Sequence, residues 1–224
     1  MKKFLAVLAL VSGMLCTEKI SAFDYDIDLH AGVNIVNMST DYVPPTIQEN
    51  LTKPMLPAEG KTFTGFTAGM GVNLEFWKGL GLQTGLDYSR RNIKADWGNM
   101  FYNDDLNGGQ VSEYNARFIY LEIPVMPSWK IKVPAVQNVI VPMIYTGPVV
   151  GIELEGTVFA GETAKVMVDW RVGAGVKLFK HWQLQASYNI PLQNNMTFTA
   201  KPIEVVGECH AKAKYWKITF GYCF

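Results

Sequence analysis

The chain has 224 residues, and lysine plus arginine equal aspartate plus glutamate at 20 each. This balance gives no basic surface of the kind that binds nucleic acid, and the length suffices for one domain. Aromatic residues make up 12% of the chain and there are 20 glycines, a combination that suits the aromatic girdles and narrow interior of a membrane barrel.

The N-terminus resembles a secretory signal peptide. Lys2 and Lys3 precede an apolar run over residues 4–15, and small residues follow at Ser21 and Ala22. We expect cleavage after Ala22, which leaves a signal peptide over residues 1–22 and an outer-membrane β-barrel over residues 23–224. Cys16 offers a lipoprotein cleavage as the less favoured alternative. The apolar run is too short for a membrane helix, and no later stretch reaches the length that one needs.

Downstream, apolar residues alternate with polar or small ones at the period of a β-strand. The alternation predicts eight strands over residues 24–35, 62–76, 80–91, 113–129, 139–155, 165–179, 182–191 and 211–224. Pro124 and Pro127 cannot donate ladder hydrogen bonds, so they predict a bulge or a strand end. Short connections near Trp77, Pro134 and His181 take turns with longer loops over residues 37–61, 96–110, 156–164 and 192–210.

The strand periodicity alone does not decide between two kinds of barrel, because the apolar face can point to lipid or into a soluble, lipocalin-like core. Asp24, Asp26 and Asp28 share one face of the first predicted strand, where they would suit a hydrated lumen. Three features favour the membrane barrel: the signal peptide, the alternation of short and long connections, and the glycines on the polar face. We therefore predict an all-β fold, an eight-stranded antiparallel up-and-down transmembrane β-barrel, located in the outer membrane.

The last predicted strand carries five large apolar residues on one face, which is the face that would meet lipid. These residues are Trp216, Ile218, Phe220, Tyr222 and Phe224. We expect Trp216, Phe220, Tyr222 and Phe224 to form an insertion signal that the barrel assembly machinery recognises.

Four charged residues face the predicted lumen at one height. Counted from the short connections at about 3.3 Å per residue and a tilt near 40°, they stand roughly 18–20 Å up. They are Asp87, Glu122, Arg171 and Lys217. Two acids and two bases in a narrow lumen should pair, because an unpaired buried charge is costly. The alternative is that shear and bulges stagger them apart.

Three short segments carry a family resemblance: YLEIPV at residues 120–125, TGP at 146–148 and DWRVGAGV at 169–176. With them the chain resembles the outer-membrane protein β-barrel domain family of Bacteroidota, which includes PorT-like proteins and is similar in architecture to the OmpA barrel. The resemblance implies a single eight-stranded barrel without catalytic residues. It also implies a possible link to secretion or gliding, with which PorT-like members are associated.

No residue pattern points to catalysis, a metal or a cofactor. His30, His181 and His210 have no partner at ligand spacing, and Cys209 and Cys223 would lie too far apart along one strand to pair. We therefore expect no enzyme but a structural or interaction protein that acts through its extracellular loops. Its expected partners are outer-membrane lipid, the assembly machinery and an unknown extracellular or envelope protein. The alternative is a narrow channel or a small-ligand-binding barrel.

Overall fold

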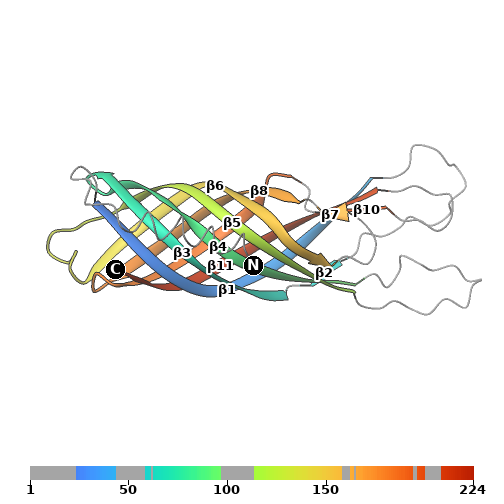
Figure 1. Ribbon diagram of the computed structural model, residues 1–224, viewed down its shortest axis with the longest axis horizontal. Coiled ribbons are helices and arrows are strands. Elements are labelled where there is room, and N and C mark those ends of the chain that lie inside the picture. The colour runs from blue at the N-terminus through green and yellow to red at the C-terminus, as the bar shows by residue number, and fades with distance from the viewer. Residues whose placement is uncertain are drawn as a thin grey trace, which may run out of the picture.

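A computed structural model gives the fold of the chain (Figure 1). It describes residues 24–43, 59–61, 63–96, 114–157, 162–163, 165–193, 196–199 and 208–224. The predicted signal peptide lies outside these residues. In the described part of the chain, no helix has the length and apolar character needed to cross a membrane.

Eight long antiparallel strands form a closed barrel. They are β1 (Asp24–Val43), β3 (Phe63–Trp77), β4 (Leu80–Asp96), β5 (Tyr114–Lys130), β6 (Ile140–Thr157), β8 (Val166–Leu178), β9 (Trp182–Pro191) and β11 (Glu208–Cys223). Each strand pairs with the next, and β11 returns to pair with β1 from Asp28↔Cys223 to Val43↔Glu208. The predicted fold class is confirmed.

Three short strands extend the sheet at one end of the barrel. β2 (Glu59–Lys61) pairs with β4, while β10 (Met196–Thr199) pairs with β11 and with β7 (Glu162–Thr163). Figure 1 places all three at the end opposite the tight turns. We call these two ends the loop end and the short-turn end.

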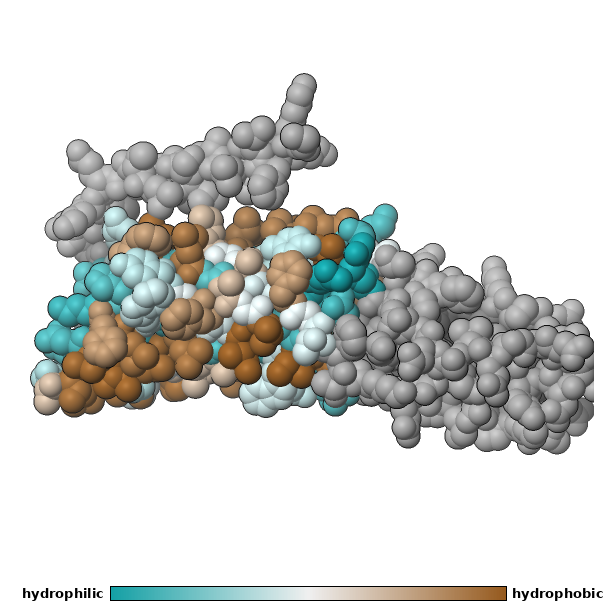
Figure 2. Space-filling view, turned by 90° about the horizontal axis from the view of Figure 1, so that it is seen from below, coloured by the Kyte–Doolittle hydropathy of each residue, from teal (hydrophilic) through white to brown (hydrophobic). Residues whose placement is uncertain are grey.

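The apolar face of the strands points outward. In β8, for example, Trp170 and Val172 are exposed while Asp169 and Arg171 are buried. Figure 2 shows hydrophobic residues over much of the visible barrel wall, with hydrophilic residues gathered toward its ends. This orientation is the one that a lipid bilayer requires, and it is the reverse of a lipocalin-like barrel with an apolar interior.

The short-turn end closes with tight connections. Lys78 and Gly79 link β3 to β4 with φ angles of 44° and 89°, the left-handed pair that a two-residue type I′ hairpin turn needs. Trp77, Trp129 and Trp182 stand exposed where strands meet these turns. In outer-membrane barrels the short turns face the periplasm, and amphipathic rings favour the membrane interface beside them.

The strands run further toward the loop end than the sequence predicts. Residues 37–43, which we expected to begin a loop, belong to β1, and His210 lies in β11 and not in a loop. Apolar residues do not alternate in these parts of the sequence, so the pattern did not show that backbone pairing continues there. The prolines of β5 also differ from expectation. The β4–β5 register is the same on both sides of Pro124, and the register shift of β5 occurs in its pairing with β6, between Ile119 and Tyr120.

Candidate functional site: a charged network across the lumen

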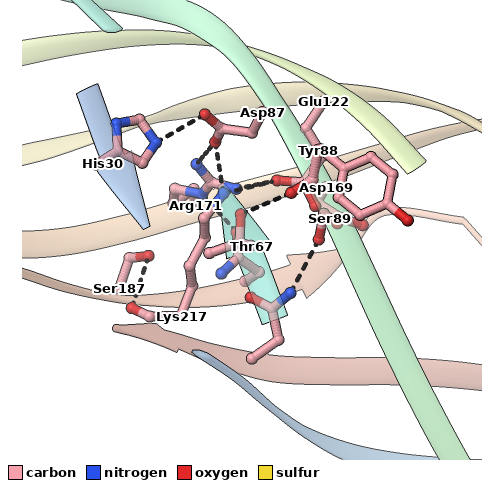
Figure 3. A network of polar contacts seen from close by, with 12 residues as sticks. His30, Thr67, Asp87, Tyr88, Ser89, Glu122, Asp169, Arg171, Ser187 and Lys217 are labelled. Carbon is pink, nitrogen blue, oxygen red and sulfur yellow. Dashed lines mark hydrogen bonds and ion pairs between the residues drawn. The ribbon is translucent and has the colours of Figure 1, made fainter. Parts of the chain in front are cut away.

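A set of charged and aromatic side chains fills the middle of the lumen, and we call it the lumen network. Its members are Asp28, His30, Asp87, Arg91, Glu122, Asp169, Arg171, Tyr215 and Lys217. Alternation along β1, β4, β5, β8 and β11 turns each of them inward. Asp87 and Glu122 are also direct cross-strand partners. Figure 3 shows most of these side chains converging from different strands.

Glu122 lies at the centre of the network and is fully buried. Its Oε1 accepts a hydrogen bond from Arg91 Nη2 at 2.7 Å. Its Oε2 accepts one from Arg171 Nη2 at 2.7 Å and another from Lys217 Nζ at 3.1 Å. One carboxylate therefore holds three cations from three other strands.

Asp87 extends the network toward β1. Its Oδ2 lies 2.5 Å from Lys217 Nζ and 3.6 Å from Arg171 Nη1, and its Oδ1 lies 2.9 Å from His30 Nε2. The other ring nitrogen of His30 lies 2.6 Å from Asp28 Oδ1. Both ring nitrogens can donate to carboxylates only as an imidazolium. With His30 charged, the network holds as many cations as carboxylates.

Glycines leave the room that these carboxylates occupy. A Cβ at Gly69 would lie 2.3 Å from Asp87 Oδ1, and one at Gly71 would lie 2.3 Å from Asp28 Oδ2. Real Cβ atoms do not approach so closely, so any larger residue would displace the acid. The glycines on the polar face of β3 are thus part of the site.

Arg91 brings in residues on the loop side of Glu122. Its Nη2 donates to Tyr215 Oη at 2.7 Å and to Asp169 Oδ2 at 3.2 Å. The guanidinium also lies over the Tyr215 ring, 3.9 Å from its centre, and over the Tyr120 ring at 4.7 Å. Such stacking is favourable for a desolvated Arg.

The structure brings together all four lumen residues singled out from the sequence: Asp87, Glu122, Arg171 and Lys217. The height calculation left out Arg91 and Tyr215, because it compared positions along strands and ignored the reach of long side chains. His30 has no partner at ligand spacing in the sequence, whereas in the structure it bridges the carboxylates of Asp28 and Asp87. The sequence signal for Arg91 is its charge on the inward face of β4, which it shares with Asp87, whereas Tyr215 carries no charge that alternation could single out.

A cavity of about 30 Å³ lies between the network and the short-turn end, lined in part by Asn73, Gln83, Gln185 and Thr219. This is room for about two water molecules. Nearer the short-turn end, Asp26 pairs with Lys130 at 2.8 Å and with Lys177 at 2.9 Å. The lumen is therefore crossed by two layers of ion pairs.

The residues of the expected insertion signal gather on the outward face near the short-turn end, apart from Trp216, which stands higher on β11. Trp216, Phe220, Tyr222 and Phe224 are all exposed. Trp182 of β9 stacks on Phe220 with ring centres 5.2 Å apart and meets Tyr222 edge-on at 5.1 Å. Their role in insertion remains a proposal.

Within the described residues, no group of three or more histidine, cysteine, aspartate or glutamate side chains is arranged to hold a metal ion. Cys223 is a buried free thiol that contacts Gln183 Oε1 at 3.1 Å. Cys209 lies near the opposite end of the same strand.

A closed antiparallel barrel with an apolar exterior and a charged interior defines an integral outer-membrane protein. The family model described as "Outer membrane protein beta-barrel domain" matches residues 24–197, and the chain belongs to this family. The protein is located in the outer membrane. No curated protein sequence matches the chain.

The fold is similar to that of a solved outer-membrane protein. The chain is similar to the outer membrane protein OprG from Pseudomonas aeruginosa, with 11% identity, a TM-score of 0.54 and coverage of 89% of this chain and 95% of OprG. AlkL, solved in DMPC lipid bilayers, gives 13% identity and a TM-score of 0.46, covering 88% and 90%. Ail of Yersinia pestis, solved with the heparin analogue sucrose octasulfate, gives 14% and 0.41, covering 90% and 99%.

Folding should be visible on a gel. The full-length protein purified in detergent should migrate faster unheated than boiled, because a closed barrel stays compact in detergent until heat separates β1 from β11. Membrane fractionation should recover the fast form with the outer membrane. Identical mobility before and after boiling, together with recovery in the soluble periplasmic fraction, would contradict the barrel.

Proposed function

We propose that the protein is a closed, non-conducting and non-catalytic barrel that serves as a structural or interaction protein through its loop end. The observation that carries this proposal is the convergence of Arg91, Arg171 and Lys217 on the buried carboxylate of Glu122. An eight-stranded barrel is only wide enough for side chains to fill its interior. A solute could cross only after several buried ion pairs had separated.

The alternative functions, a narrow channel or a small-ligand-binding barrel, need open space in the lumen. A cavity of about 30 Å³ accommodates water but not a metabolite. A narrow path for small ions would have to pass both the lumen network and the pairs of Asp26 with Lys130 and Lys177. These contacts support the closed barrel over the channel or ligand binder.

The proposed partner lies on the extracellular side, where β1 and β11 extend together to Val43 and Glu208. The family that residues 120–125, 146–148 and 169–176 resemble includes PorT-like members, which are associated with secretion and gliding, and this motivates a role in these processes. A secretion role predicts that deleting the gene makes exported cargo accumulate in the periplasm. Normal export in the deletion strain would leave only the generic structural or interaction role.

Conductance in planar bilayers tests the closed lumen. The wild-type barrel should insert without steady openings, because the lumen network fills the path. Simultaneous replacement of Arg91 and Tyr215 by serine should produce measurable openings, since both large side chains occupy the lumen above Glu122. Arg117→Ser removes an exposed arginine and serves as the matched control. Steady large openings from the wild type would refute the closed barrel and favour a pore.

A further inference from the structure

The outward face of β4 changes from apolar to charged near the loop end. Leu80, Leu82, Leu86 and Tyr88 point outward along the strand, and the next outward residue is Arg90. At about 3.3 Å per residue and a tilt near 40°, Arg90 stands roughly 25 Å above Leu80. This distance matches the height of the apolar band of an outer-membrane barrel. Arg90 therefore lies at the level where lipid acyl chains give way to headgroups.

Neighbouring side chains hold Arg90 in place. Its guanidinium carbon lies 5.9 Å from the centre of the Phe66 ring, which in turn packs on Tyr88 with ring centres 5.5 Å apart. Arg90 Nε donates to Asn92 Oδ1 at 3.1 Å, and Asn92 Nδ2 donates to the Thr64 carbonyl at 2.7 Å. The stem and Nε are thus fixed, and the two terminal nitrogens form the end of the group that projects from the barrel.

A second arginine lies beside this one on the outward face. Asn92 is the direct cross-strand partner of Arg117 on β5, which places Arg117 diagonally next to Arg90. Arg117 pairs with Glu155, but both side chains are exposed, and exposed ion pairs contribute little to stability. An anion between the two guanidinium groups can replace that pair at little cost. With Glu155 counted, the three side chains carry a net charge of +1.

We propose that Arg90, Asn92 and Arg117 bind the phosphate of an outer-leaflet lipid headgroup. Arginine presents a planar fork of donors that matches phosphate oxygens, and Asn92 holds that fork open toward the membrane surface. The aromatic pair of Phe66 and Tyr88 packs beside Arg90, and aromatic rings favour the membrane interface. A soluble phosphate would meet the same donors, but only a lipid also places acyl chains along the apolar wall beneath them.

Native mass spectrometry of the full-length protein tests this site. The protein is reconstituted in phosphatidylcholine nanodiscs that contain increasing amounts of phosphatidic acid. The fraction of protein that retains bound phosphatidic acid is then measured at each phosphatidic acid content of the nanodisc. Arg90→Gln should weaken retention about tenfold, since it removes a charge-assisted contact. Arg90→Lys should weaken it less, because charge remains while the fork is lost. Lys180→Gln, which removes an exposed charge at the short-turn end, should leave retention unchanged.

Three results would overturn the proposal: unchanged retention in the Arg90→Gln/Arg117→Gln double variant, an equal loss in Lys180→Gln, or displacement of the lipid by inorganic phosphate at comparable concentration. The last would assign the site to free phosphate. Heat-dependent gel mobility checks that each variant is folded. Arg117 is exposed and lies outside the lumen, so Arg117→Gln alone carries the test should Arg90→Gln fail to fold.

Discussion

Replacing Glu122 with glutamine should lower the free energy of unfolding by about 3–5 kcal/mol. The amide keeps the size of the side chain but removes the charge that holds Arg91, Arg171 and Lys217. Asp87 and Asp169 would remain as the acidic partners of three buried cations. A charge without a full partner inside the barrel costs far more than the pair itself contributes. Urea titration in detergent micelles, followed by the mobility of the folded form, measures the loss.

Two further variants separate charge balance from packing. Glu155→Gln also neutralises a glutamate paired with an arginine, but at an exposed position, so it should change stability by less than about 1 kcal/mol. Adding Lys217→Met to Glu122→Gln removes one surplus cation and should restore part of the lost stability. A loss below about 1 kcal/mol in Glu122→Gln, or no recovery in the double variant, would contradict a charge-balanced network.

The architecture could be predicted because a barrel wall repeats one simple rule. Inward and outward residues alternate along the eight strands, even where the sequence pattern is weak, as on β6, where Ile144 and Ile152 are exposed. The strand ends beyond the membrane could not be found in this way. Past Asn37 on β1 the sequence no longer alternates, although backbone pairing with β11 continues to Val43.

Strand alternation predicts only part of the lumen network. Alternation identifies Asp87, Glu122, Arg171 and Lys217 as inward, but it carries no information on the register between strands. Register decides that Asp87 lies opposite Glu122 and that Arg171 lies opposite Asn189. Hydrogen bonds such as the one from Arg171 Nε to Asn189 Oδ1, at 2.6 Å, follow from that pairing. Tyr215 joins the network for a further reason. Its side chain is long enough to reach Arg91 and Glu122, although their strand positions lie at different heights in the barrel.

The aromatic residues at the end of β11, together with Phe224 directly after it, form a row that the assembly machinery could recognise in an extended strand. Phe220, Tyr222 and Phe224 lie on one face at every second position, and all are exposed in the folded barrel. Tyr222 and Phe224 also meet edge-on with ring centres 5.2 Å apart. Such a row is present before the barrel closes, since it depends only on strand alternation. We therefore propose that it serves insertion as well as anchoring in lipid.

Replacing Phe220 and Phe224 together with serine should reduce the amount of folded protein in the outer membrane severalfold. Each change removes an apolar ring from the lipid-facing wall, at a cost of about 2 kcal/mol, and also removes the row that the assembly machinery is proposed to bind. The heat-modifiable form in outer-membrane fractions, compared with degradation in the periplasm, is the measurement. Phe76→Ser is the matched control. Phe76 on β3 is similarly exposed and also lies near the short-turn end, but it is outside the row. It should retain most of the folded protein. An equal drop in Phe76→Ser would reduce the row to ordinary lipid contact, and unchanged levels in the double variant would rule out an insertion signal at these positions.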